Sequence, residues 1–443
     1  MSESLALARP QEAASSPVEV PRGKPRIVII GGGFGGIAAA KALRACDADV
    51  VVIDRRNHHI FQPLLYQVAT AVLAPSEVAA PIRQLAAKQE NTSVMLAEVI
   101  DIDLKSRSVV TDVLGVGTRK IGFDYLVVAA GMQSSYFGHN EFAEYAPCLK
   151  TITDAERIRS KILSAYELAE ATDDPDERQR QMTFVLVGAG PTGVELAASL
   201  AQMATKTLQR NFRRIDPTKT SIILLEGGKR VLPTFAESLS KKAAKHLGKL
   251  GVQVKTASMV EHIDAQGVTV GGTLIPCGTV LWTAGVSPSP LVKMLGVAVD
   301  RAGRACVGPF MNVPDARGVF VVGDTATLMQ NGRPLPGVAQ VAIQQGRYVG
   351  RLITRELRGR KSPRPFHYFD KGNMAVVGKN YAILESGHIR LAGLTAWLAW
   401  AIVHLMFLPQ LQNRLRVQNQ WLWSYFTGQR SSRLVAEAPR TSK

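Results

Sequence analysis

The chain has 443 residues, enough for two or three domains, and its 46% hydrophobic and 20% charged residues are ordinary for a folded protein. A disordered chain and a small disulfide-stapled protein are therefore excluded. Basic residues outnumber acidic ones by 53 to 36, and 15 basic but only 4 acidic residues fall within 351–443, which gives that segment a charge of +11. Such a segment predicts an anionic partner, either a nucleic acid or a membrane surface.

The start of the chain carries no recognisable signal. Residues 1–24 are rich in Ala, Ser and Pro, lack an apolar run and mix acidic with basic residues, so we expect a disordered leader. Four cysteines are spread along the chain without a CxxC pair: Cys46, Cys148, Cys277 and Cys306. This spacing predicts neither a structural metal site nor an adjacent redox dithiol, and it fits a reducing compartment.

A nucleotide-binding pattern begins at residue 26. A β-branched strand over 26–30 runs directly into a glycine turn and then into an Ala-rich helix. The turn contains Gly31, Gly32, Gly33 and Gly36. In the spacing GxGxxG the first glycine makes the turn, the second admits a pyrophosphate and the third lets helix and strand pack closely. A second strand ends in Asp54, a carboxylate suited to a ribose hydroxyl, so we predict a Rossmann-like dinucleotide site.

The same pattern recurs after residue 181. A strand over 182–187 leads into Gly188, Gly190 and Gly193, and a later strand ends in Glu226. That acid comes 38 positions after the first glycine, where about 20 is usual, which weakens the assignment. It favours NAD over NADP, although Lys229 and Arg230 leave the choice open. Two dinucleotide sites favour an enzyme that passes a hydride from a nicotinamide to a flavin.

Three further segments fit a flavin site. A strand over 124–128 ends near Ala130 and Gly131, and a similar strand and small-residue turn lies over 280–285. A third strand ends in a Gly-Asp pair, and its carboxylate, Asp324, is well placed to hydrogen-bond a flavin ribityl chain.

These motifs resemble those of the two-dinucleotide-binding flavoproteins related to glutathione reductase and, more narrowly, of the type II NADH dehydrogenases. The resemblance extends from about residue 25 to residue 426, and its most specific segments are 57–69, 188–197, 339–346 and 372–379. It implies an α/β fold with two Rossmann-like domains, FAD and NADH as cofactors, no metal, and a membrane quinone as acceptor. The implied parts are an FAD domain over 25–150 and 291–384, an NADH domain over 151–290, membrane-anchoring helices over 385–430 and a tail over 431–443.

The resemblance also implies a quinone site. Gln340 and Gln344 match its AQxxxQ segment, and at i, i+4 on a helix their amides share one face. Ala339, Ala342 and Gly346 are small enough to let a ring approach, whereas the alternative is an ordinary solvated helix face.

Two charged residues also match the family pattern. Glu195 matches a glutamate beside nicotinamide and flavin, which would deliver a proton or position the nicotinamide, or would only complement the helix dipole. Lys379 would line the quinone pocket or remain solvated.

The implied reaction is ping-pong: NADH gives a hydride to FAD, NAD⁺ leaves, and a quinone then takes two electrons and two protons, with no proton pumping. One alternative is a sulfide:quinone oxidoreductase, which would need cysteines such as Cys148 and Cys306 beside the flavin. Another is a membrane-bound NADH sensor without turnover. Nucleic-acid binding is disfavoured, because the basic residues are mixed with apolar ones.

The C-terminal segment predicts membrane attachment. Residues 391–408 form an apolar run whose helix would be about 27 Å long, slightly short of a hydrocarbon core of about 30 Å. Pro409 separates it from an amphipathic, Trp-rich segment that ends at Phe426. We expect two interfacial helices on an anionic surface, at the cytoplasmic side of a cell inner membrane, with a single span or a homodimer contact as alternatives.

The +11 charge would then be the electrostatic half of this anchor. On this interpretation the apolar helices supply the hydrophobic part of the anchor. A chain shortened after about Arg390 should then be a soluble flavoprotein with impaired access to lipid-dissolved quinone.

Overall fold

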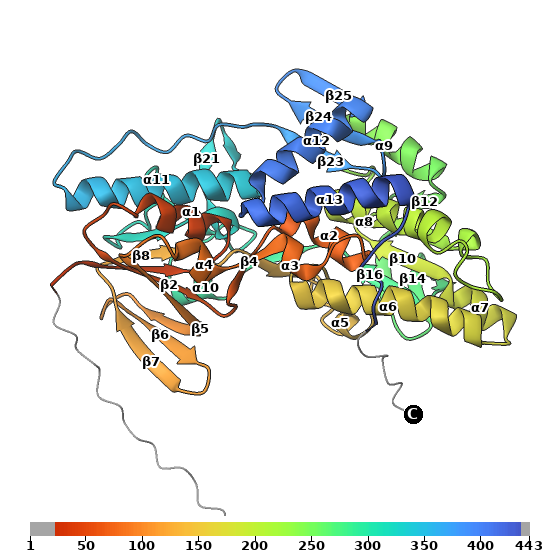
Figure 1. Cartoon of the computed structure of the whole chain (residues 1–443). Helices are drawn as coiled ribbons and strands as arrows, with labels where there is room; N and C mark the ends of the chain where they lie inside the picture. The colour runs from red at the N-terminus through yellow and green to blue at the C-terminus, as the bar shows by residue number, and fades with distance from the viewer. Residues whose placement is uncertain (1–22, 436–443) are drawn as a thin grey trace, which may run out of the picture.

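The computed structural model describes residues 23–435, so nearly all of the predicted leader and most of the predicted tail lie outside the described residues. Two parallel sheets organise the molecule (Figure 1). The first contains, in spatial order, β19 (Val319–Val321), β8 (Tyr125–Val128), β1 (Arg26–Ile30), β2 (Asp49–Asp54), β5 (Thr92–Asp103), β6 (Ser108–Val113) and β7 (Gly117–Gly122). Its strands from β19 to β5 pair in parallel, which is the order of a Rossmann-like sheet.

The second sheet repeats this arrangement. Its strands are β12 (Val252–Lys255), β11 (Ser221–Leu225), β10 (Thr183–Val187) and β16 (Thr279–Trp282), all parallel. After their first residues, Arg26 and Thr183, the central strands β1 and β10 are apolar and buried, as expected for parallel strands covered on both faces. The predicted α/β class with two Rossmann-like units is therefore confirmed.

Smaller antiparallel pairs connect these sheets. They are β3 (His58–Ile60) with β4 (Ala79–Pro81), β9 (Met132–Ser134) with β17 (Val286–Pro288), β21 (Met329–Gln330) with β22 (Arg333–Pro334), and β13 (Val260–Ile263) with β14 (Gly267–Val270) and β15 (Thr273–Pro276). The short strands β18 (Ala305–Cys306) and β20 (Ala326–Thr327) pair in parallel. Further helices are α3 (Pro75–Val78), α4 (Ile82–Ala86), α5 (Phe142–Tyr145), α9 (Glu237–Lys249) and α10 (Leu291–Met294).

Long helices follow the two glycine turns and cover the sheets. α1 (Phe34–Ala42) follows β1, and α8 (Pro191–Gln202) follows β10. α11 (Ala339–Leu357) crosses α1 so closely that a Cβ at Gly346 would lie 2.1 Å from the carbonyl oxygen of Gly35. Glycine at these positions therefore brings the two helices into backbone contact.

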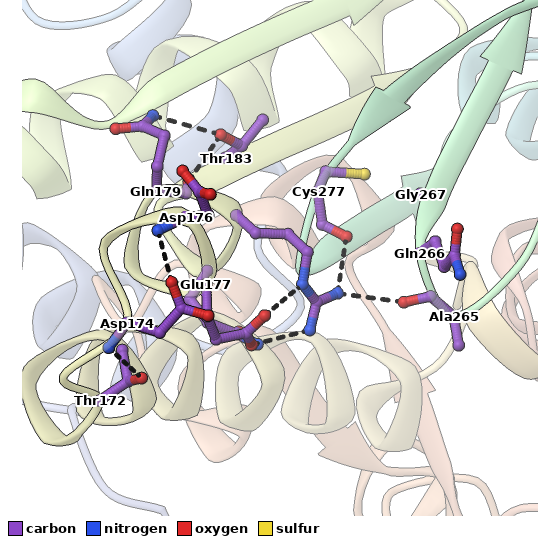
Figure 2. Close-up of polar contacts among 12 residues, drawn as sticks. Thr172, Asp174, Asp176, Glu177, Gln179, Thr183, Ala265, Gln266, Gly267 and Cys277 are labelled. Atoms are coloured by element: carbon purple, nitrogen blue, oxygen red, sulfur yellow. Dashed lines mark hydrogen bonds and ion pairs between the residues drawn. The ribbon is translucent and has the colours of Figure 1, made fainter.

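The second unit is closed at its far end by a polar cluster (Figure 2). α6 (Ile152–Ala171) leads to α7 (Pro175–Gln181), which Asp174 caps by accepting a hydrogen bond from the backbone N–H of Asp176. Arg180 forms a two-point ion pair with Glu177 and also donates to the carbonyl oxygens of Ala265 and Cys277. This arginine therefore ties α7 to the turn between β13 and β14 and to the link between β15 and β16.

The C-terminal region starts with a small antiparallel sheet of β23 (Asn373–Val376), β24 (Ala382–Ser386) and β25 (Ile389–Gly393). Two helices follow, α12 (Leu394–Phe407) and α13 (Leu411–Thr427), with Pro409 between them. The predicted apolar helix thus begins three residues later than 391, because residues 391–393 complete β25. No helix within residues 23–435 is long and apolar enough to cross a membrane.

Both C-terminal helices are built into the core rather than appended to it. Figure 1 shows them lying across the middle of the molecule, over α2 (Leu65–Ala69) and α8. Trp400 and Val417 are buried in the same apolar cluster as residues of α2 and α8. A chain shortened after Arg390 would uncover this cluster, so the burial argues against the expectation that such a chain is a soluble flavoprotein.

The charge is also distributed differently from the prediction. Six of the fifteen basic residues lie on the distal half of α11 and in the loop that follows it: Arg351, Arg355, Arg358, Arg360, Lys361 and Arg364. Figure 1 places that end of α11 at the edge of the molecule, away from α12 and α13. These six residues are therefore separated from α12 and α13, and the interpretation of the whole +11 as part of one anchor stays a prediction.

Candidate functional site

The two glycine turns have the same geometry. A Cβ at Gly36 would lie 1.8 Å from the carbonyl oxygen of Gly31, and a Cβ at Gly193 would lie 1.9 Å from that of Gly188. Gly31 and Gly188 have φ angles of +102° and +99°, which favour glycine. The first and last glycines of each fingerprint are therefore required by the fold itself.

The middle glycines leave room for a ligand. At Gly33 and Gly190 nothing lies within 4 Å of an added Cβ, and these residues begin α1 and α8 without a side-chain cap or a first-turn acid. By contrast, Thr151 caps α6 with its side chain. Uncapped helix N-termini present free N–H groups to an anion, so both turns fit the pyrophosphate of a dinucleotide.

A carboxylate closes each turn from the neighbouring strand. Asp54 accepts a hydrogen bond of 2.6 Å from the N–H of Gly32, and Glu226 accepts one of 2.7 Å from the N–H of Ala189, which occupies the same place in the second turn. β2 and β11 pair with β1 and β10 in equivalent registers. Glu226 therefore corresponds to Asp54 in three dimensions, and its late place in the sequence reflects only a longer crossover between the strands.

The remaining predicted flavin-site residues gather at the carboxyl ends of the first sheet. Ala130 and Gly131 follow β8, and Asp324 lies just after β19, beside Gly337. Burial raises the pKa of the Asp324 carboxyl, while the positive charges of Lys150 and Arg304 partly oppose this shift. The Asp324 carboxylate, with the positive charges of Lys150 and Arg304 nearby, is suited to hydrogen-bonding the polar ribityl chain of a flavin.

Glu195 is buried between the two units. It is 8% exposed and lies on the second turn of α8, and its carboxylate accepts a hydrogen bond of 3.3 Å from the N–H of Val376. A cavity of about 80 Å³ is lined by this residue together with residues 62–63, 65–66, 149–150 and Thr192. Burial raises the pKa of Glu195 to about 8, so it is a group that can hold or release a proton near neutral pH.

Two other titratable groups line this cavity. Tyr66 of α2 is buried, and burial followed by the negative charge of Glu195 raises the pKa of its phenol. Burial lowers the pKa of Lys150, with Asp324 opposing the shift. The cavity therefore joins the Asp324 region to Glu195. Tyr66 lies in the specific segment 57–69, but the sequence prediction gave it no role, and Lys150 lies outside every motif.

The predicted quinone-site glutamines share one face of α11 but are engaged by the chain itself. The Gln344 amide exchanges two hydrogen bonds with the backbone of Phe369, and Gln340 donates to the carbonyl oxygen of Gly372 over 3.3 Å. The side-chain oxygen of Gln340 is buried without a partner among the described residues. Of the two, only Gln340 therefore keeps a free acceptor.

Their neighbours differ from expectation as well. Ala342 and Gly346 pack against α1 and Gly323, so their small size serves helix packing rather than the approach of a ring. The adjacent Gln345, which is 1% exposed, accepts a hydrogen bond of 2.7 Å from the N–H of Gly323 and thereby fixes the turn that carries Asp324. The sequence prediction did not identify Gln345, although it lies in the same motif.

Lys379 lies apart from the cavity. It is exposed in the loop between β23 and β24, where its ammonium group donates to the carbonyl oxygen of Tyr425 over 2.6 Å. The same ammonium group lies 3.9 Å from the centre of the Tyr425 ring. The structure thus brings Glu195, Asp324 and the glycine turns into one region and places Lys379 at the end of α13.

Comparisons with known proteins agree with this geometry. The family model for pyridine nucleotide-disulphide oxidoreductases matches residues 25–346. The chain is 43% identical to the type II NADH:quinone oxidoreductase NdhA of Mycobacterium tuberculosis, over 90% of this chain and 87% of NdhA. It is also 43% identical to the type II NADH:quinone oxidoreductase Ndh of the same organism, over 95% of this chain and 93% of Ndh. The solved structure of NDH2 from Plasmodium falciparum in complex with NADH has the same fold, with a TM-score of 0.84 at 20% identity over 92% of this chain and 99% of that one.

Proposed function

The chain belongs to the type II NADH:quinone oxidoreductases, within the pyridine nucleotide-disulphide oxidoreductase family, and from this membership we propose that it oxidises NADH and reduces a quinone. The structural observation that carries the proposal is the pair of equivalent dinucleotide turns, each closed by a carboxylate, with Glu195 buried on the helix that follows the second turn. One dinucleotide site would suffice for an NADH sensor, whereas two sites serve a transfer between two cofactors.

The residues that would hold the cofactors follow from the two turns. The first turn, with Asp54, Asp324, Ala130 and the N-terminus of α11 at Ala339, fits FAD. The second turn fits NADH, with Glu226 available to a ribose hydroxyl. When bound, FAD would supply the redox chemistry by accepting a hydride from NADH and passing two electrons to the quinone.

Glu195 is proposed to supply protons. Reduction of a quinone to a quinol consumes two protons, and a carboxyl whose pKa lies near 8 is mostly protonated at pH 7. Its burial beside Tyr66 and Lys150 keeps that proton close to the cavity. Gln340 is the proposed hydrogen-bonding residue for the quinone, because its amide oxygen lacks a partner among residues 23–435. Gln344 and Lys379 instead would hold the 366–372 loop and α13 in place.

We further propose that α12 and α13 rest on a membrane surface. Each helix carries an exposed apolar stripe, one of Leu394, Leu398, Ile402 and Met406 and the other of Leu411, Leu415, Leu422 and Phe426. The spacing of four residues in the first stripe keeps it on one helix face, which suits a helix lying in the plane of the interface. Exposed Arg390 and Arg416 flank the stripes and suit anionic lipid headgroups. The proposed location is the cytoplasmic side of the cell inner membrane.

Vesicle flotation tests the membrane surface. The double variant Leu398→Glu/Ile402→Glu should lose binding to anionic vesicles, while Leu114→Glu, at a side chain 84% exposed on the β6–β7 turn, should bind like the wild type. Equal binding of all three proteins would contradict the proposal. Dimerisation of the wild type through the same stripes, without vesicle binding, would support the homodimer alternative.

The enzymatic proposal is tested by turnover. Purified protein given NADH and a short-chain quinone should oxidise many equivalents of NADH per flavin, with quinol as the product. Binding of NADH without quinone-dependent turnover would instead support a sensor. Activity that requires sulfide and is lost in a Cys148→Ala/Cys306→Ala variant would support a sulfide:quinone oxidoreductase; in the structure both cysteines are free thiols.

A further inference from the structure

The chain after α13 turns back into the protein at a single glycine. α13 ends at Thr427, and Gly428 has a φ angle of +71°, a left-handed conformation that reverses the chain direction at a helix end. The hydroxyl of Thr207, just beyond α8, donates to the carbonyl oxygen of Gly428 and fixes the turn. The next residues therefore point toward the core and away from the apolar stripes.

Arg430 is the residue that this turn delivers to the core. Its side chain is buried, with 6% of the residue exposed, and it has no ion pair with a carboxylate among the described residues. Its two terminal nitrogens donate to the carbonyl oxygens of Thr70, over 2.7 Å, and Ser199, over 2.8 Å. A buried cation is costly, and here backbone carbonyls rather than a counter-charge satisfy it.

These two carbonyls belong to the helices that carry the Tyr66–Glu195 pair. Thr70 ends α2, where unpaired helix carbonyls attract a cation. Ser199 lies one turn beyond Glu195 on α8, just before the chain widens into a π-helical turn at Met203–Thr207. The hydroxyls of Thr70 and Ser199 are also hydrogen-bonded to each other over 2.7 Å. One planar guanidinium thus bridges both helices at the point where they touch.

A second contact reaches α2 from the same C-terminal segment. The indole N–H of Trp421 donates to the side-chain oxygen of Gln67 over 2.7 Å, and the Gln67 amide donates to the Tyr66 hydroxyl over 2.9 Å. α2 is only five residues long, so its position depends on such contacts more than on its own hydrogen bonds. The C-terminal segment therefore contacts α2 at its middle, through Gln67, and at its C-terminal end, through Thr70.

We propose that Arg430 is a positioning residue of the oxidoreductase, which holds α2 against α8 and so keeps Tyr66 packed beside Glu195 at the cavity. The catalytic role in this inference rests on the proposed function. The contact between α2 and α8 that Arg430 stabilises can be tested without turnover. Arg430 is not among the residues that line the cavity, and its side-chain hydrogen bonds go to the backbone of Thr70 and Ser199. Its charge also interacts with the Tyr66 phenol.

The position of Glu195 can be measured without substrate. The raised pKa of Glu195 depends on its burial, so loosening α2 should admit water and shift that pKa downward. In the full-length, FAD-loaded protein, an infrared titration follows the band of the protonated carboxyl, and Glu195→Gln identifies which band belongs to Glu195. Tyr66 and Lys150 are the other titratable groups that line its cavity, and neither absorbs in the carboxylic acid region.

We expect Arg430→Gln to lower the pKa of Glu195 by about one unit or more, and Arg430→Lys to restore part of that shift. Arg414→Gln is the matched control, since it removes a charge and a hydrogen bond to a backbone carbonyl from the same C-terminal region, where Arg414 donates to Leu408 rather than to α2 or α8. An unchanged Glu195 titration in Arg430→Gln, with or without a lower Tm, would overturn the proposal.

A second variant covers the case in which Arg430→Gln does not fold. Ser199→Ala removes the hydroxyl bond between the same two helices, and its Glu195 pKa should move in the same direction by a smaller amount. An unchanged titration there would equally overturn the proposal.

Kinetics separate positioning from simple destabilisation. In quinone reduction, Arg430→Gln should lower kcat about tenfold in the wild-type background and hardly at all in Glu195→Gln, because residues that act together are not additive. Equal losses in both backgrounds would contradict the coupling. If Arg430→Gln shifts the Glu195 titration as expected but the wild-type protein shows no turnover, the proposed function is refuted and the positioning role of Arg430 is not.

Discussion

Replacement of Glu195 by Gln should change how the stability of the protein depends on pH. The buried carboxyl has a pKa of about 8, against a usual 4.5, so the folded protein keeps a proton that the unfolded chain releases between these values. The stabilisation that the protonated Glu195 contributes is therefore complete below pH 4.5, decreases as the pH rises through this window and is lost above pH 8. The gap corresponds to about 5 kcal/mol at about 1.36 kcal/mol per pKa unit, as an upper bound.

The glutamine variant keeps the shape and the acceptor for the Val376 N–H but cannot ionise. The free energy of unfolding of the variant should therefore increase relative to that of the wild type as the pH rises from 5 to 8. With an unfolding entropy of about 2.1 cal/mol/K per residue, the full difference is worth about 6 °C in Tm for one cooperative unit of this size. Thermal unfolding of both proteins across this range measures it. Parallel curves, or the same trend in Glu167→Gln on the exposed face of α6, would refute the reasoning.

Three further changes have definite expected outcomes. A chain that ends after Arg390 should give little soluble flavoprotein, because it lacks two core helices; a stable yellow product would contradict this, and soluble yield with flavin content measures it. Gly193→Ala should abolish NADH binding in a titration while FAD is retained, because the added Cβ meets the carbonyl of Gly188, whereas Gly248→Ala, with open space around it, should bind NADH normally. Glu226→Gln should raise KM for NADH about tenfold more than KM for NADPH in steady-state assays, and equal effects on both would contradict its ribose role.

The parts of the fold that sequence reasoning predicted are those in which local chemistry and tertiary structure coincide. The last glycine of each fingerprint is required by the carbonyl oxygen of the first glycine in the same turn, so the motif and the geometry have one cause. Glu226 shows the limit of spacing rules, because the pairing of β11 with β10 places it correctly whatever the length of the crossover. A strand register therefore predicts the ribose carboxylate better than a count of residues does.

The parts that were missed depend on contacts between distant segments. Neither Lys150 nor Arg430 lies in a motif, and their surroundings are assembled from helices far apart in the chain. Gln345 was passed over for Gln344, since periodicity alone did not decide which amide faces the turn at Gly323. The charge of the basic C-terminal segment was hard to interpret from sequence for a similar reason. Part of that charge lies on α11, which the fold places away from α12 and α13.

The central claim is that one chain passes electrons from NADH through FAD to a quinone, and the absorption spectrum of the bound flavin tests it most directly. Under anaerobic conditions, NADH should bleach the flavin of the purified protein, and a short-chain quinone added afterwards should restore the oxidised spectrum. A flavin that stays oxidised after NADH is added, or one that NADH bleaches but quinone does not reoxidise, would contradict the account.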